Sequence, residues 1–389
     1  MKVYLDNAAT TPLDKEVFNA MLPFMTEHFG NPSSTHSFGR KTKTAIETSR
    51  RIISSALNCR PSEICFTSGG TEADNLAIRG SVNDLGCDRI IISKLEHNAV
   101  IATAEEFEAK GMIELNYVNL TPKGHIDLDH LEKLLSMGGK CLVSLMHGNN
   151  EIANLLPIKT VGELCKKYDA IFHSDTVQTM GHYAFDLQDI HIHFITGAAH
   201  KFHGPKGIGF LYINRKVQVK AMITGGGQER QQRCGTENIY GIVGIGKAMQ
   251  VAYEELEDHK KLIGGLKQYM IEQLAENVPG CEINGDSAST ESLYTVLNIT
   301  LPENPNSAMM IFLLDLEGVA CSGGSACSSG ATKGSHVLTA IHAIRPNRTS
   351  VRFSFSKFTS KEEIDYAVGK VKNLCVVKEV KPERATQAY

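Results

Sequence analysis

Strand-forming runs alternate with helix-forming runs from residue 64 to residue 213, and this alternation restricts the fold more than any other feature. Short apolar runs predict strands at residues 64–67, 89–92, 113–118, 142–146, 171–172, 194–195 and 209–213. Apolar residues at helical spacing predict helices at residues 15–25, 40–57, 99–109, 128–135 and 161–168, and a further helix that opens at Glu72. Such a chain folds as α/β, with a mainly parallel sheet whose ligands bind outside the carboxyl ends of the strands.

A second, smaller domain is predicted in the C-terminal part. A long helical stretch, residues 238–276, is expected to leave the large domain and to break near Gly264 and Gly265. Strands near residues 293–299 and 351–355 and helices near residues 307–316 and 362–374 follow, which indicates α+β. A chain of 389 residues suits this division. We expect a large domain at residues 15–256 and a small domain made of residues 1–14 and 257–389.

One lysine and one aspartate stand at the ends of neighbouring predicted strands. Asp175 closes an apolar run, and Lys201 follows the next run in a glycine-rich turn, directly after His200. A lysine in a loop is usually a solvated surface residue. A lysine desolvated at a strand end is instead a candidate Schiff-base nucleophile. Pyridoxal phosphate needs such a lysine and a carboxylate that keeps its ring nitrogen protonated, so this pair predicts that cofactor.

The cofactor also needs a phosphate site, and the turn Ser68-Gly-Gly-Thr71 before a helix is the candidate. Small residues at a helix N-terminus leave backbone N–H groups and the helix dipole available to an anion. The alternative is that Thr71 only caps the helix. With Asp175 and Lys201 downstream, we favour the anion site.

Further polar residues fall at predicted strand ends or in loops: His97, Asn150 and Gln178. His97 either stacks on a ring or is an ordinary loop histidine. Residues 4–12 cap another domain, border a site or form a simple turn. Cys327 lies in the glycine- and serine-rich run 322–330 and is either a nucleophile or an ordinary thiol.

Composition excludes several classes of function. The net charge of −3 with both signs mixed gives no reason to expect a nucleic-acid or membrane partner. The chain turns polar after five residues, so we expect neither a signal peptide nor a membrane span. Ten cysteines without a regular framework indicate reduced thiols and a cytoplasmic protein. The run Gly241–Lys247 lacks the Ser or Thr of a P-loop, and neither His191 with His193 nor Cys321 with Cys327 has further zinc ligands, so no metal is expected.

Several segments together resemble the cysteine desulfurases of the class V aminotransferase family, which use pyridoxal phosphate on fold type I. The resemblance is specific because the motifs occur jointly and in order to residue 354. They are Tyr4-Leu-Asp-Asn-Ala-Ala-Thr-Thr, Gly30-Asn-Pro-Ser-Ser, Thr67-Ser-Gly-Gly-Thr-Glu-Ala-Asp-Asn-Leu, Glu96-His97, Asn149-Asn-Glu-Ile, Ser174-Asp-x-x-Gln178, His200-Lys-x-x-Gly-Pro-Lys-Gly, Gly225-Gly-Gly-Gln-Glu-Arg, Gly235-Thr236, Gly324-Ser-Ala-Cys-Ser and Ser350-Val-Arg-Phe-Ser354. It implies a mainly parallel seven-stranded sheet in the large domain and a small α+β domain that carries the catalytic-cysteine loop.

The resemblance also implies a role for each residue. Lys201 would hold the cofactor covalently, Asp175 would pair with its ring nitrogen, and His97 would stack on the ring. The remaining residues would surround the ring hydroxyl (Gln178 and Asn150), the phosphate (Gly70, Thr71 and His200, with Thr236 from the partner of a homodimer) and the substrate carboxylate (Arg352). Cys327 would accept sulfur from L-cysteine as a persulfide, leaving L-alanine. The long span from Cys327 to Arg352 resembles the subgroup that passes sulfur to scaffold proteins for iron–sulfur clusters or thio-cofactors.

Three departures from the family pattern stand out. Ala198 replaces a usual serine before His200, so one phosphate contact is expected to be missing, and Gly148 and Cys234 replace a larger residue and a serine. The alternatives are a selenocysteine lyase, an aminotransferase, or a scaffold protein with this fold and no turnover. Cys327 argues against transamination, and Ala198 is the one feature that favours a protein without turnover. Cys321 is interpreted as a bystander rather than a second sulfur carrier.

Overall fold

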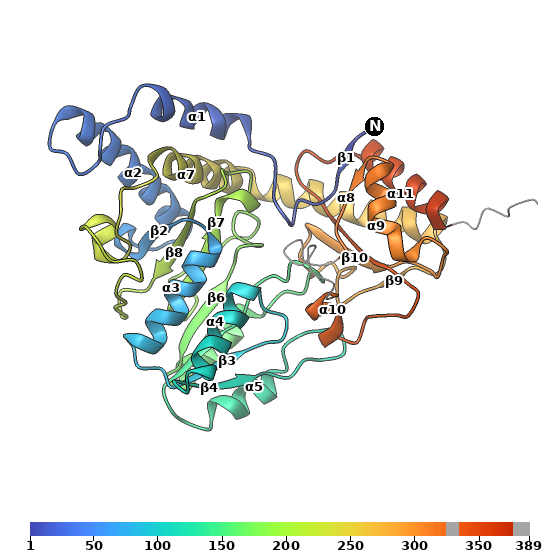
Figure 1. Ribbon diagram of the computed structural model, residues 1–389, viewed down its shortest axis with the longest axis horizontal. Helices are drawn as coiled ribbons and strands as arrows, with labels where there is room; N and C mark the ends of the chain where they lie inside the picture. The colour runs from blue at the N-terminus through green and yellow to red at the C-terminus, as the bar shows by residue number, and fades with distance from the viewer. Residues whose placement is uncertain (324–333, 376–389) are drawn as a thin grey trace, which may run out of the picture.

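A seven-stranded sheet forms the centre of the larger part of the molecule (Figure 1). The structure is a computed structural model and describes residues 1–323 and 334–375. In the described chain the strand order is β2-β8-β7-β6-β5-β3-β4, and only β8 runs antiparallel to its neighbours. This confirms the predicted mainly parallel sheet. The strands are β2 (Ile64–Thr67), β3 (Arg89–Ile92), β4 (Glu114–Tyr117), β5 (Cys141–Ser144), β6 (Ile171–Asp175), β7 (Phe194–Ala198) and β8 (Gly209–Ile213).

Helices cover both faces of this sheet, and the side-chain alternation of the strands explains why. Phe66 on β2 packs into one apolar cluster, whereas its neighbour Cys65 packs into another on the opposite face. One face is covered by α3 (Gly70–Asn83) and α4 (Asn98–Ala109). The other face is covered by α1 (Lys15–Thr26), α2 (Ser37–Ala56), α5 (Leu128–Leu135), α6 (Ile158–Lys167) and α7 (Ile239–Glu254).

The smaller part has its own apolar core, which includes residues from both ends of the chain. Val3 and Leu5 lie in it beside side chains of the C-terminal helices. Its strands form two small sheets, one of β12 (Ser350–Ser354), β10 (Val296–Thr300) and β9 (Glu282–Ile283), the other of β1 (Val3–Tyr4) with β11 (Val319–Ala320). Its helices are α8 (Leu256–Asn277), α9 (Met310–Leu316), α10 (His336–Ala340) and α11 (Lys361–Cys375).

The described chain also has short 3₁₀ turns in both parts, which are η1 (Pro61–Glu63), η2 (Ala199–Lys201), η3 (Gln228–Gln231) and η4 (Ser307–Met309). The exact domain boundaries at residues 14/15 and 256/257 stay a prediction.

The predicted helix break at Gly264 and Gly265 is wrong. The interruption falls at Glu255, between α7 and α8, and α8 continues through both glycines. Glycine costs only about 1 kcal/mol in a helix interior. Ile263 and Leu266, on either side of the glycines, are buried in the core of the small domain, and this packing outweighs the low propensity.

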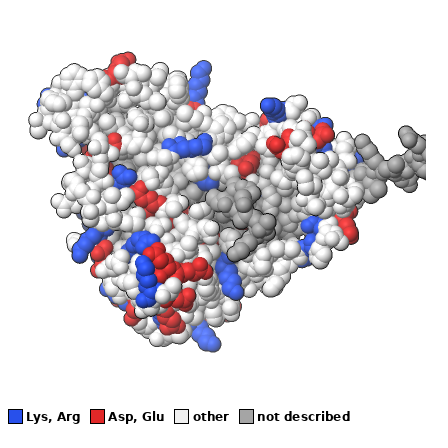
Figure 2. Space-filling view, viewed as in Figure 1, with Lys and Arg blue, Asp and Glu red and all other residues white. Residues whose placement is uncertain are grey.

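Figure 2 shows positive and negative side chains side by side on the visible face. Ion pairs between such side chains include those of Glu106 with Arg79 and Lys110. None of the helices in the described ranges has the length and apolar character needed to cross a bilayer.

Candidate active site

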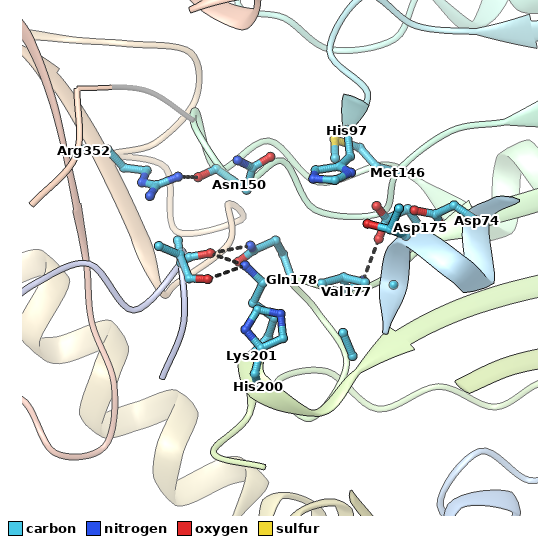
Figure 3. A pocket seen from close by; sticks show the side chains of 15 residues that line it. Asp74, His97, Met146, Asn150, Asp175, Val177, Gln178, His200, Lys201 and Arg352 are labelled. Atoms are coloured by element: carbon cyan, nitrogen blue, oxygen red, sulfur yellow. Dashed lines mark hydrogen bonds between the residues drawn. The ribbon is translucent and has the colours of Figure 1, made fainter. Parts of the chain in front are cut away.

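A cavity of about 220 Å³ opens where the carboxyl ends of β6 and β7 meet the N-terminus of α3 (Figure 3). The N-terminal segment and β12 of the small domain close its other side. Most of the predicted site residues line it: Gly70, Thr71, His97, Asn150, Asp175, Gln178, His200, Lys201 and Arg352. Thr236 is exposed and does not line this cavity. Cys327 lies outside the described residues.

Lys201 enters the cavity from η2, directly after β7. Its Nζ donates hydrogen bonds to the carbonyl oxygens of Ala8 at 2.6 Å and Ala9 at 2.9 Å. Gln178 Nε2 also donates to Ala8 O, at 2.9 Å. The N-terminal segment therefore borders the site and is more than a simple turn, and Lys201 is no surface lysine.

Asp175 ends β6 at the opposite end of the cavity (Figure 3). One carboxylate oxygen accepts a hydrogen bond from Val177 N at 2.9 Å. Burial, together with the nearby Asp74, raises the pKa of Asp175 to about 6, although His97 acts in the other direction. A buried carboxylate of this kind is stabilised when a proton donor or a cation binds to it.

His97 has a structural role in addition to any role toward a ligand. It is the N-cap of α4, and its Nδ1 accepts a hydrogen bond from Ala99 N at 3.1 Å. Burial lowers the pKa of His97, although Asp175 opposes the shift. The imidazole is therefore neutral near pH 7 and carries its proton on Nε2.

Asp74 is a cavity residue that the sequence analysis missed. It lies one turn after Gly70 on α3, is 1% exposed, and places Oδ1 3.4 Å from His173 Nε2. Burial raises the pKa of Asp74 to about 7. In the described chain, donor atoms of Asp74, His97 and Asp175 lie within 4.8 Å of one another, a set that would also suit a divalent cation. The four-residue spacing from Gly70 was the available signal, because it places both residues on one helix face.

The N-terminus of α3 has the properties of an anion site. Its N-cap is Gly69, which has no side chain, so the interpretation of Thr71 as the cap is wrong. Within residues 1–323 and 334–375, no group accepts a hydrogen bond from the backbone N–H of Gly70 or Thr71. A Cβ on Gly70 would lie 2.8 Å from Val177 Cγ2, so the close approach here requires glycine.

His200 lies beside this N-terminus, and its Nδ1 is 3.2 Å from Thr10 Oγ1. Burial lowers the pKa of His200 to about 4, and Lys201 and Lys206 contribute to the shift. A neutral imidazole at this place can donate one hydrogen bond to an anion without an additional charge.

Arg352 approaches from β12 and is 1% exposed. Its Nη2 lies 2.8 Å from Asp6 Oδ1, and its Nη1 donates to Asn150 O at 3.0 Å (Figure 3 shows the second contact). Its buried Nε has no hydrogen-bond partner in the described part of the chain. Asp6 also accepts a hydrogen bond from Ser322 Oγ at 2.8 Å. Asp6 was not predicted, although it precedes the asparagine of an N-terminal motif.

The three departures from the family pattern have different surroundings. Ala198 lines the cavity without a hydroxyl group. A Cβ on Gly148 would lie 2.5 Å from Thr179 Cγ2, so this chain has no room for a larger residue there. Cys234 is buried and its backbone N–H donates to Ile223 O at 3.4 Å.

Comparison with known proteins adds independent information. The profile of the aminotransferase class-V family matches residues 3–367. The cysteine desulfurase IscS of Dictyoglomus turgidum is 41% identical over 370 residues, which is 94% of this chain and 93% of that protein. The cysteine desulfurase IscS of Methanosarcina thermophila is 40% identical over 369 residues, covering 93% of this chain and 89% of that protein.

Solved structures agree with these matches. A NifS-like protein has a TM-score of 0.87 and 34% identity, and the match covers 96% of this chain and 99% of that one. A structure described as SspA in complex with cysteine has a TM-score of 0.79 and 30% identity, with 92% and 100% covered.

Proposed function

The chain belongs to the aminotransferase class-V family, and we propose that it is a pyridoxal-phosphate-dependent cysteine desulfurase that converts L-cysteine to L-alanine and places the sulfur on Cys327. One observation carries the proposal: Lys201 and Asp175 line the same cavity as the buried Arg352 and as Gly70 and Thr71, whose backbone N–H groups have no acceptor among the described residues. The relatives named cysteine desulfurase, and the similar structure that contains cysteine, support the choice of substrate.

The residues of the cavity fit pyridoxal phosphate. The unpaired N–H groups of Gly70 and Thr71 and the neutral His200 suit its phosphate, and Asp175 suits a protonated ring nitrogen. Lys201 would hold the cofactor covalently, His97 would pack on the ring, and Gln178 and Asn150 would lie near the ring hydroxyl. When bound, the cofactor delocalises the negative charge that develops on the substrate Cα.

The chain's own residues supply binding and proton transfer. Arg352 binds the substrate carboxylate with the N–H groups that Asp6 and Asn150 leave available, which fixes the position of Cα. Lys201 Nζ would take the proton from the substrate Cα and act as the base of the reaction. Asp175 would hold a proton on the ring nitrogen of the cofactor.

The sulfur step belongs to Cys327. Its thiolate attacks the substrate sulfur, a sulfur–sulfur bond forms, and the Cβ–S bond breaks with its electron pair left on carbon. Protonation of that carbon, and return of a proton from Lys201 Nζ to Cα, yields alanine, so L-cysteine and the Cys327 thiol give L-alanine and a Cys327 persulfide. Burial raises the pKa of the Cys321 thiol to about 12, which supports its interpretation as a bystander.

A homodimer is part of the proposal. Phe18, Leu22 and Met25 are exposed on one face of α1, with Phe29 exposed just after the helix. Apolar side chains grouped in this way are typical of protein interfaces. Thr236, exposed and outside its own cavity, would reach the cofactor phosphate of the partner. The sulfur acceptor would be a scaffold protein or another enzyme of iron–sulfur or thio-cofactor assembly.

A cytoplasmic location is proposed from the thiols. The nine cysteines in the described ranges are all free, which suits a reducing compartment.

The test is L-cysteine turnover by purified, cofactor-loaded protein with a reducing thiol, with sulfide and alanine measured together. We expect equal amounts of both, and we expect Cys327→Ala to lose both while keeping the bound chromophore. Cys321→Ala is the matched control and should remain active. An active Cys327→Ala variant would refute the persulfide step. Pyruvate-dependent turnover would favour an aminotransferase, and a protein that takes up no cofactor would favour a scaffold.

A further inference from the structure

The outer edge of the large sheet is covered by side chains. β2 is the edge strand, paired on one side with β8. On its other side, Arg50 Nη1 donates to Ile64 O at 2.7 Å, and Phe66 N donates to Glu229 Oε2 at 2.8 Å. Two charged side chains thus satisfy backbone groups that a further strand would otherwise bind.

Arg50 and Glu229 also bind each other in two places. Arg50 Nη1 lies 2.8 Å from Glu229 Oε2, and Nη2 lies 2.6 Å from Oε1. Both side chains are 3% exposed, and the guanidinium stacks 4.7 Å from the centre of the Phe66 ring. Two parallel bonds between planar groups fix orientation as well as distance. The pair therefore holds Glu229 in one position against β2.

The backbone at Glu229 is strained. Glu229, Arg230 and Gln231 have φ values of 43°, 55° and 66°, three consecutive left-handed residues without a glycine. This region is unfavourable for side chains with a Cβ, and a run of it persists only where surrounding contacts hold it. The buried Arg50–Glu229 pair is the contact that does so. Such strain is concentrated at functional sites, and the strained turn is therefore a candidate for a role in function.

A second ion pair connects the same segment to the anion site. Arg233 Nε lies 3.0 Å from Glu72 Oε1, in the first turn of α3. Glu72 Oε2 in turn accepts a hydrogen bond from Ser68 N at 2.8 Å. Residues 229–233 therefore support the β2–α3 turn from both sides, at the strand before it and at the helix after it. Gly70 and Thr71, whose N–H groups have no acceptor among the described residues, lie between these two supports.

We infer that Glu229 is a positioning residue for the cofactor phosphate: with Arg50 and Arg233, it holds the β2–α3 turn so that the N–H groups of Gly70 and Thr71 converge on the anion. This inference rests on the proposed function. Thr236 follows this segment, three residues after Arg233, and its proposed contact in the partner's site is also with the cofactor phosphate. The ring and the aldehyde carbon of the cofactor do not depend on this support.

The test compares two ligands of the apoprotein, pyridoxal phosphate and pyridoxal, which lacks the phosphate. Equilibrium titration of wild type and Glu229→Gln should show pyridoxal phosphate bound about tenfold or more weakly by the variant, and pyridoxal bound within about twofold of wild type. Glu132→Gln is the matched control, because Glu132 forms an ion pair with Lys167 at 2.6 Å and contacts neither Arg50 nor residues 229–233 in the described part of the chain. Its ratio of the two affinities should equal that of wild type.

If Glu229→Gln does not fold, Arg233→Met tests the same inference. Arg233 is partly exposed, so its replacement should be tolerated, and the substitution removes only the ion pair with Glu72. Arg233→Met should also bind pyridoxal phosphate more weakly relative to pyridoxal than wild type does. The inference would be overturned if the folded variants bound both ligands as wild type does. It would also be overturned if they bound both ligands more weakly by the same factor, since that result indicates a general structural role. Failure of wild type to bind either ligand would instead refute the proposed function itself.

Discussion

Replacing Arg352 with lysine tests the substrate clamp most directly. The guanidinium spans Asp6 Oδ1 and Asn150 O, at 2.8 Å and 3.0 Å, and has further N–H groups for a carboxylate. A lysine ammonium keeps the charge but has its three donors on one atom, so it cannot bind both partners and the substrate. A hydrogen bond to a charged group contributes about 1.5–3 kcal/mol. Loss of one such bond to the substrate carboxylate predicts roughly 10- to 150-fold weaker binding.

The assay is the KM for L-cysteine, together with titration of the bound chromophore by L-alanine, the product. Cysteamine, which lacks the carboxylate, should bind wild type and Arg352→Lys within about twofold of each other, because it makes no use of the clamp. Arg345→Lys, at a partly exposed arginine of the same domain, is the control and should leave all three values unchanged. An unchanged L-alanine affinity in Arg352→Lys, or an equal loss for cysteamine, would refute the assigned role.

Two further predictions concern the apoprotein. Gly70→Ala should lower the free energy of unfolding by up to about 2 kcal/mol in a urea titration, since the clash with Val177 outweighs the better helix propensity; a variant as stable as wild type would contradict this. Asp74→Asn should remove part of the pH dependence of stability. Burial raises the pKa of Asp74 from 3.8 to about 7, so in this interval the unfolded chain releases a proton that the folded chain keeps. The stability of wild type therefore falls as pH rises across it, by at most about 1.4 kcal/mol per pH unit from this group. Thermal unfolding at pH 5 and pH 8 should show that this rise in pH destabilises wild type more than the variant, and equal losses would refute the argument. Burial, the largest cause of the raised pKa values of Glu96 and Asp175, acts in both proteins, and loss of the Asp74 charge reduces these two shifts, which weakens the pH dependence of the variant further.

The large domain was predictable because most of its helices and strands can be recognised from their own residues, without knowledge of their tertiary contacts. Residues 89–92 and 209–213 were predicted as strands and residues 128–135 as a helix, with the bounds that the structure has. The two strands are continuous apolar runs, and the helix has apolar residues at helical spacing, so each can be recognised from its own residues. β1, β9 and β11 have two residues each and no period of their own, and they were missed. β1 exists because Val3 pairs with Val319, from the far end of the chain.

The site divides in the same way. Lys201, Asp175 and Gly70 were found because their residue types and their places at strand ends or before a helix carry a chemical meaning. Asp6 and Asp74 were missed because an aspartate near a turn or inside a helix is ordinary. Their importance comes from partners that are distant in sequence: Asp6 pairs with Arg352, and Asp74 lies beside His173.

The sequence by itself determined the α/β class and the family, and it predicted the residues proposed to bind and react, because these depend on local periodicity and on side-chain chemistry. Only the tertiary structure decided which acids surround those residues, how Arg352 is held, and that Glu229 binds Arg50 and the backbone of Phe66 at the edge of β2. Burial and distance produce these effects: a carboxylate changes its proton affinity, and an arginine its orientation, only when packing removes water and brings a distant partner within bonding distance.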